Sequence, residues 1–157
     1  MNAVEEYKQR VAYRDSVVSF EDAVKKHPEA LTGDAADEKN PLEHLFADGL
    51  YIRKIFMPAG QVIVSKIHKY NHPYFVLKGK VSVLTDTGVE KISAPHYGIT
   101  TVGTKRVLNV IEDTIWITVH ATDKTDLKEV EEEIIAKDFK DPQISQHDME
   151  LLLEDKS

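Results

Sequence analysis

The 157-residue chain contains no cysteine and no long hydrophobic run. Without cysteine there is no disulfide, no thiolate nucleophile and no cysteine-ligated metal, so the ligands of any bound metal must be histidine, carboxylate or water. No stretch is long and apolar enough to span a membrane, and the first residues, MNAVEEYKQR, lack the apolar segment of a signal peptide. We therefore expect a cytoplasmic protein that has no membrane partner.

The chain also lacks the clustered basic face that nucleic-acid-binding proteins present. Its formal net charge is −7. Residues 50–120 carry nine basic and four acidic residues, whereas the two flanks carry eleven basic and twenty-three acidic residues. This distribution argues against a nucleic-acid partner and leaves room for a small anionic ligand in the central segment. Acidic flanks that only keep the protein soluble would explain the same distribution.

The N-terminal zone, residues 1–47, predicts an arm of helix and loop. Ser19 begins a possible helix-capping sequence, and residues 33–40 are polar and rich in turn-forming residues. Pro41 then opens a short turn or helix with the sequence PLEHLF. None of these segments carries a pattern that indicates chemistry.

The central zone, residues 48–122, changes to the period of β-strands. Polar and apolar residues alternate, Val, Ile, Tyr and Phe are frequent, and Pro-Ala-Gly and Asp-Thr-Gly mark turns. About seven short strands without an intervening helix predict an all-β core, an antiparallel jelly-roll barrel. Residues 123–157 return to a helical pattern, so that both flanks of the barrel are expected to be helical. The leucines at 151–153 predict that this tail packs on the barrel or on a second copy of the chain.

Two histidines flank a tight turn in the central zone. Alternate residues of a strand share a face, which puts Lys66 and His68 of VIVSKIH together with the valines on the inward face. After a turn at residues 69–71, His72 and Tyr74 share a face of the next strand. Two such histidines can converge on one metal ion, and imidazole suits Zn, Fe, Ni, Cu or Mn. The alternative is that both histidines are surface residues beside a turn.

These residues resemble the first motif of the cupin family, which runs Gly, five residues, His-X-His, three or four residues, Glu, six residues, Gly. With the final glycine at Gly79, the glutamate position falls on His72 and the two histidine positions fall on Lys66 and His68. The second motif, Pro-X-Gly followed after two residues by His, aligns with VGTKR, so that Arg106 occupies the histidine position. The resemblance covers under half of the chain.

The central segment is also similar to small cupin-like proteins of unassigned function from phages and bacteria. The resemblance implies a jelly-roll barrel with a divalent transition metal, such as Zn, Fe, Ni or Mn, bound inside it. Only His68 matches its ligand position, because protonated Lys66 and Arg106 have no lone pair to donate. His120 shares a strand face with Trp116 and is the best candidate for a third ligand. Three histidines with an open position are typical of a catalytic metal site, although His120 could equally be a core residue.

The departures from the motif suggest a second interpretation. Lys66 and Arg106, facing inward, would form a cationic pocket for a carboxylate or phosphate, lined by Tyr74 and Trp116. Aromatic residues on a barrel strand are more often part of the core, and the two basic residues could face water at a turn. The acidic residues of the central zone, Asp86, Glu90, Glu112 and Asp113, are all expected in turns away from this pocket.

Three functions therefore remain open. The first is a small cupin-like protein that binds a divalent metal through His68, His72 and His120 and acts on or senses a small, anionic molecule. The second is a metal-free barrel that binds an anion without turning it over. The third is a structural or interaction protein that works as an oligomer, and a homodimer is expected in any case because open sheet edges need covering. The sequence leaves open whether the protein is an enzyme.

Overall fold

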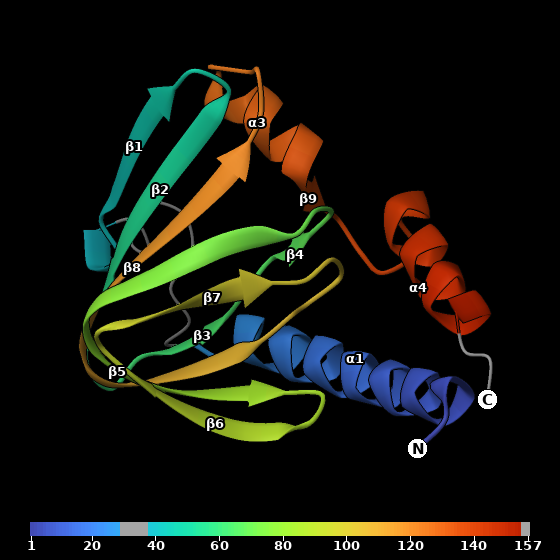
Figure 1. Ribbon diagram of the computed structural model, residues 1–157. Helices are drawn as coiled ribbons and strands as arrows, with labels where there is room; N and C mark the ends of the chain where they lie inside the picture. Colours follow the sequence, from blue (N-terminus) through green and yellow to red (C-terminus); the bar gives the residue numbers. More distant parts are fainter. Residues whose placement is uncertain (29–37, 155–157) are drawn as a thin grey trace.

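The structure is a computed structural model that describes residues 1–28 and 38–154 (Figure 1). Helices lie toward the two ends of the chain and strands lie between them. In chain order the elements are α1 (Ala3–Lys25), β1 (Leu42–Ala47), β2 (Leu50–Met57), β3 (Val62–Val64), β4 (Ile67–His68), β5 (His72–Thr85), β6 (Gly88–Ser93), β7 (His96–Thr100), β8 (Val107–Ala121), α3 (Leu127–Ile134), β9 (Ile135–Ala136) and α4 (Pro142–Glu154).

Seven strands form one antiparallel sheet. Its order is β1-β2-β8-β5-β6, with β3 paired to β8 and β7 paired to β5, while β4 and β9 form a separate two-stranded ladder. The predicted antiparallel core with helices at both ends is confirmed. The sheet does not close into a barrel, because no pairing among the described strands joins β1 to β6 or β7. The interior is instead closed at one end by the ladder and by α3 (Figure 1).

The long strands β5 and β8 change register at Gly79. The pairing shifts between residues 76 and 81 of β5, and Gly79 has a φ of 96°, which side-chain-bearing residues rarely adopt. A Cβ at this position would overlap the carbonyl oxygen of Asp113 and the hydroxyl of Thr114 on β8. Only glycine therefore fits, and the irregularity lets β5 curve around the interior (Figure 1).

The inward face of the curved sheet carries the main hydrophobic core. Tyr74 and Trp116 stack there with ring centroids 4.8 Å apart, and Val81 is completely buried. Fully burying one large apolar side chain contributes about 1.5–3 kcal/mol, so this cluster is a principal source of stability. Its buried members are Met57, Tyr74, Val76, Val81, Val83, Ile92, Leu108, Val110 and Trp116.

The C-terminal helices pack against the sheet core. α3 covers one end of the inward face, where Val130 and Ile134 contact Tyr51 of β2. α4 packs through the fully buried Ile144, and Asp148 forms an ion pair with Arg14 of α1 at 2.7 Å. No helix of the described residues is long and apolar enough to span a membrane.

Three local predictions are wrong, and in the two that concern strands the pairing with a neighbouring strand outweighs the local signal. Ser19 does not begin a helix: α1 is continuous from Ala3, and the Asn2 side chain caps it by accepting a hydrogen bond from the Glu5 amide at 2.9 Å. The sequence PLEHLF forms strand β1 because it pairs with β2 over its whole length. Glu90 lies in β6, and Glu112 and Asp113 lie in β8, and not in turns. The loop predicted over residues 33–40 lies mostly outside the described residues.

Candidate metal centre

Three histidines from three strands meet on the inward face of the sheet. His68 ends β4, His72 begins β5 after a three-residue turn, and His120 lies near the end of β8. The pairing of β5 with β8 sets Tyr74 opposite Thr118, so His72 and His120, two residues further along, also lie on neighbouring positions. The chain therefore brings together residues that are up to 52 positions apart.

The three imidazole rings are packed against one another. Their centroids are 4.3 Å apart for His68 and His72, 4.4 Å for His72 and His120, and 5.2 Å for His68 and His120. One nitrogen from each ring can be chosen so that all three lie within 4.8 Å of one another. Because metal–nitrogen bonds are about 2.0–2.1 Å long, an ion between the rings would need only small side-chain rotations. The residues present therefore fit a three-histidine metal site.

Burial keeps these rings uncharged. His72 and His120 are each only 4% exposed. Desolvation, with smaller contributions from His72 and His120, lowers the pKa of His68 to about 2. Desolvation, then His72 and Arg53, lowers the pKa of His120 to about 3, and desolvation also lowers the pKa of His72. Neutral imidazoles with free lone pairs are the form that binds metals.

Hydrogen bonds orient two of the rings. The Nδ1 of His72 lies 3.4 Å from the carbonyl oxygen of Tyr70, which can only accept a hydrogen bond. In the tautomer with the proton on Nδ1, this hydrogen bond forms and Nε2 keeps its lone pair. The Nε2 of His120 lies 2.9 Å from the hydroxyl of Thr118, on the same strand face. Partners of this kind fix ring orientation at metal sites.

The backbone around His68 is held by segments distant in sequence. Its carbonyl oxygen accepts a hydrogen bond from the Gly103 amide at 3.0 Å, and the next amide, that of Lys69, donates to Ile134 of α3 at 2.8 Å. His68 also pairs with Ile135 of β9. The C-terminal segment therefore positions one of the three histidines, which the sequence did not predict.

Arg106 is half-buried beside Tyr74, one of the two predicted aromatic residues. Its guanidinium carbon is 5.4 Å from the centre of the Tyr74 ring, and its Nε is buried without a hydrogen-bond partner among the described residues. Tyr74 and Trp116 are 6% and 7% exposed and belong to the hydrophobic core. Arg106 also lowers the pKa of His72, which places its charge near the histidine cluster.

Lys66 does not join this group. The strand predicted over VIVSKIH breaks between β3 and β4, so the alternation that would turn Lys66 inward is lost. The Lys66 side chain is 61% exposed and its Nζ lies 3.5 Å from a carboxylate oxygen of Glu131. The prediction that Lys66 faces inward beside His68 is therefore wrong, and its counter-charge is Glu131 on α3.

Arg53 takes the place that the sequence assigned to Lys66. It pairs with Thr118 on the inward face, two residues along β2 from Tyr51, which stacks on His120. Burial lowers the pKa of Arg53, and its charge in turn lowers the pKa of both His68 and His120. The alternation of β2 could have placed Arg53 on the inward face. The same alternation was equally compatible with Ile52 and Lys54 facing inward.

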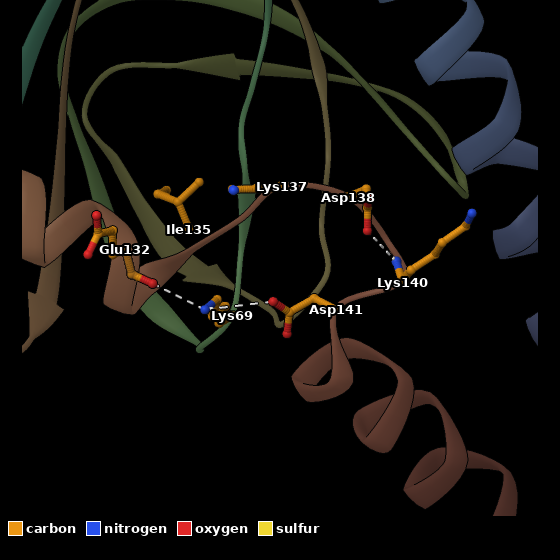
Figure 2. A pocket seen from close by; sticks show the side chains of 7 residues that line it. All are labelled: Lys69, Glu132, Ile135, Lys137, Asp138, Lys140 and Asp141. Carbon is orange, nitrogen blue, oxygen red and sulfur yellow. Dashed lines mark hydrogen bonds and ion pairs between the residues drawn. The ribbon is translucent and has the colours of Figure 1, made fainter.

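A surface hollow of about 330 Å³ lies next to the histidine turn but holds none of these groups. Figure 2 shows its lining, in which lysines alternate with acidic residues. Lys69 donates to the carbonyl oxygen of Glu132 at 3.1 Å and lies 3.7 Å from Asp141 (Figure 2). Because its central lysine is already neutralised, this hollow is a less suitable anion site than the inward face.

No protein-family model matches the sequence, and a search of curated proteins finds no match. Among solved structures, the cupin domain of Cnp3 from Schizosaccharomyces pombe is similar at 22% identity and a TM-score of 0.45, over 52% of this chain and 64% of that one. An RmlC-like cupin family protein from Methanocaldococcus jannaschii is similar at 17% identity and a TM-score of 0.46, over 61% of this chain and 93% of that one. Ectoine synthase from P. lautus is similar at 13% identity and a TM-score of 0.49, over 60% and 72% of the two chains. Cupin-domain proteins are thus among the solved structures similar to this chain.

Proposed function

We propose that this protein binds one divalent transition-metal ion through His68, His72 and His120. The observation that carries the proposal is the convergence of three imidazoles, two buried and one half-buried, whose ligand nitrogens lie within 4.8 Å of one another. Zinc, iron, nickel and manganese are all compatible with imidazole ligands. Three protein ligands leave a coordination position open, and a bound ion would polarise an oxygen atom placed there. A sensor would use that position for affinity alone, and an enzyme would use it for chemistry.

The molecule bound at the open position is, in this proposal, a small anion. Arg53 and Arg106 both approach the histidine cluster, and neither forms an ion pair with an acidic side chain of the described residues. The charge of Glu131 raises the pKa of Arg53, but the Glu131 carboxylate is paired with Lys66. Partly buried cations without a partner are costly, and a guanidinium matches the geometry of a carboxylate or phosphate. An anionic ligand would offset that cost.

Metal uptake tests the first part of the proposal. Equilibrium dialysis of the purified protein against Zn²⁺, Ni²⁺ or Mn²⁺, followed by elemental analysis, should give one ion per chain. The double variant His68→Ala/His72→Ala should bind none, because neither neighbouring arginine can replace a lost nitrogen donor. His96→Ala is the matched control, since this histidine contacts Tyr74 at 3.1 Å and lies outside the three-histidine group. No uptake by the native protein, or equal loss in the control, would contradict the proposal.

Ligand screening tests the second part. Small carboxylates and phosphates should raise the melting temperature of the native protein, and the gain should shrink with added salt because it is electrostatic. Arg106→Ala should abolish the gain, whereas Lys91→Ala, an exposed residue of β6, should not. An equal gain in the native protein and in Arg106→Ala would exclude Arg106 as the anion-binding group. An equal gain with and without metal would favour a metal-free anion-binding protein.

A further inference from the structure

The outward face of the sheet carries apolar residues on five strands, with one ion pair, between Glu43 and Lys54, on β1 and β2. One cross-strand row runs from β1 to β7 through four consecutive pairs: Glu43, Lys54, Ile117, Phe75 and Tyr97. A parallel row contains Leu45, Ile52 and Val119 on β1, β2 and β8, and Pro73 with Ile99 on β5 and β7. All of these residues face away from the histidine cluster, because their strand neighbours face inward. Together with Leu77 they form what we call the outer apolar face.

Much of this face is accessible to solvent. The exposed fractions are 76% for Tyr97, 64% for Leu45, 59% for Ile99, 58% for Leu77 and 38% for Phe75. At about 150–200 Å² for a large apolar side chain, these five residues alone expose roughly 500 Å². A patch of that size is at the upper end of what monomeric proteins leave uncovered, and larger ones mark interaction sites.

The pattern of β8 also indicates a covering layer. Its outward residues Ile115, Ile117 and Val119 are apolar, although an antiparallel strand with one solvated face normally alternates with polar residues. The described helices pack elsewhere. On α1, Tyr13 donates to the carbonyl oxygens of Leu84 and Lys105, while α3 and α4 pack on the inward face and on the β4–β9 ladder. Within residues 1–28 and 38–154, no helix covers the outer apolar face.

We propose that a second copy of this chain covers the outer apolar face, forming a two-fold symmetric dimer. A two-fold axis requires a self-complementary surface, and this face is apolar on both copies. Its charged pair, Lys54 and Glu43, is joined at 2.9 Å and so adds no net charge to the contact. The exposed area of the five residues, together with the partly exposed centre of the face, approaches the roughly 800 Å² per partner of a stable interface.

Strand β7 gives a second reason. It lies at an edge of the sheet, and its five residues, HYGIT, include no lysine, acidic residue or proline. Such an edge offers unpaired backbone groups to other chains unless something covers it. Since Tyr97 and Ile99 of β7 belong to the outer apolar face, the same dimer would shield this edge. The proposal does not depend on the metal site.

Analytical ultracentrifugation of the full chain should show a dimer. The double variant Phe75→Lys/Tyr97→Lys should weaken dimerisation on the order of 100-fold or more, because it places charges at the centre of the contact. Its far-UV circular dichroism should be unchanged. Val89→Lys is the matched control, since Val89 is 66% exposed on β6 and lies outside the face. A monomeric native protein, or a double variant that still dimerises, would overturn the proposal.

A second measurement covers the case in which the double variant does not fold. Because the chain has no cysteine, Leu77→Cys provides a single site for a spin label. The dimer predicts a defined distance between labels at position 77 that is shorter than the distance between labels on Val89→Cys. No coupling at position 77 would overturn the proposal. If Leu153→Lys abolished the dimer and the labels on Leu77→Cys were uncoupled, the dimer contact would lie on the C-terminal tail. That result would also overturn the proposal.

Discussion

The buried histidine cluster predicts that the metal-free protein loses stability as the pH falls below about 6.5. In the folded chain the pKa of His68 is about 2 and that of His120 is about 3, and the pKa of His72 is lowered in the same direction. In the unfolded chain all three return to the ordinary value near 6.5. Between these limits the unfolded state binds more protons than the folded state, so acid favours unfolding.

The size of this effect follows from proton linkage. One pH unit below the unfolded pKa, each histidine that stays neutral in the folded state costs about 1.4 kcal/mol. His68 and His120, with pKa values of about 2 and 3, together cost about 2.7 kcal/mol between pH 7.5 and pH 5.5, and His72, whose pKa is lowered as well, adds to this loss. This is a large part of the roughly 5–15 kcal/mol by which most proteins are stable. The stability that the neutral histidines contribute is fully present above about pH 7 and decreases steadily toward pH 4.

Urea unfolding in the presence of a chelator, at pH 7.5, 6.5 and 5.5, measures this loss. The variant His68→Gln/His72→Gln retains one buried histidine, so its loss should fall to about 1.4 kcal/mol over the same range. His147→Gln on α4 lies outside the cluster and should leave the native loss unchanged. A loss of less than about 1.4 kcal/mol in the native protein would contradict the lowered pKa values of His68 and His120. A double variant that loses as much stability as the native protein would contradict them equally.

Two further predictions concern the scaffold. Gly79→Ala should destabilise the protein by several kcal/mol in urea unfolding, because its Cβ would overlap β8. Gly60→Ala is the control, since Gly60 has a similar positive φ but open space around it, and it should cost only about 1 kcal/mol. Arg14→Ala should cost about 3–5 kcal/mol by leaving the carboxylate of Asp148 buried with a weaker partner, and Lys25→Ala, at an exposed ion pair, should cost less than about 1 kcal/mol. If Gly79→Ala cost no more stability than Gly60→Ala, the close approach of β5 and β8 at Gly79 would be contradicted. If Arg14→Ala cost no more than Lys25→Ala, the buried ion pair between Arg14 and Asp148 would be contradicted.

Local patterns in the sequence were sufficient to predict most of the strands and the first two histidines, but not strand β1. Alternation and turn residues mark the sheet, and His68 and His72 are only four positions apart, so a short turn brings them together. His120 could be suggested because it alternates with Trp116 on one strand. The same reasoning failed for Lys66, since alternation holds only while a strand continues, and the chain leaves strand geometry between β3 and β4. Across such an interruption the face of a residue no longer follows from alternation, and Lys66 faces solvent although His68 reaches the cluster.

Tertiary structure alone decided which residues surround the candidate metal centre. Arg53 joins His120 because β2 pairs with β8 in one particular register, and a shift by one residue would have turned Lys54 inward in its place. His68 is held by Gly103 and by α3 and β9, which no local pattern connects with it. The amino-acid sequence thus determined, through local chemistry, which segments favour strands and which side chains are available as ligands. The register between distant strands, set by the packing of the whole core, determined which of those ligands meet.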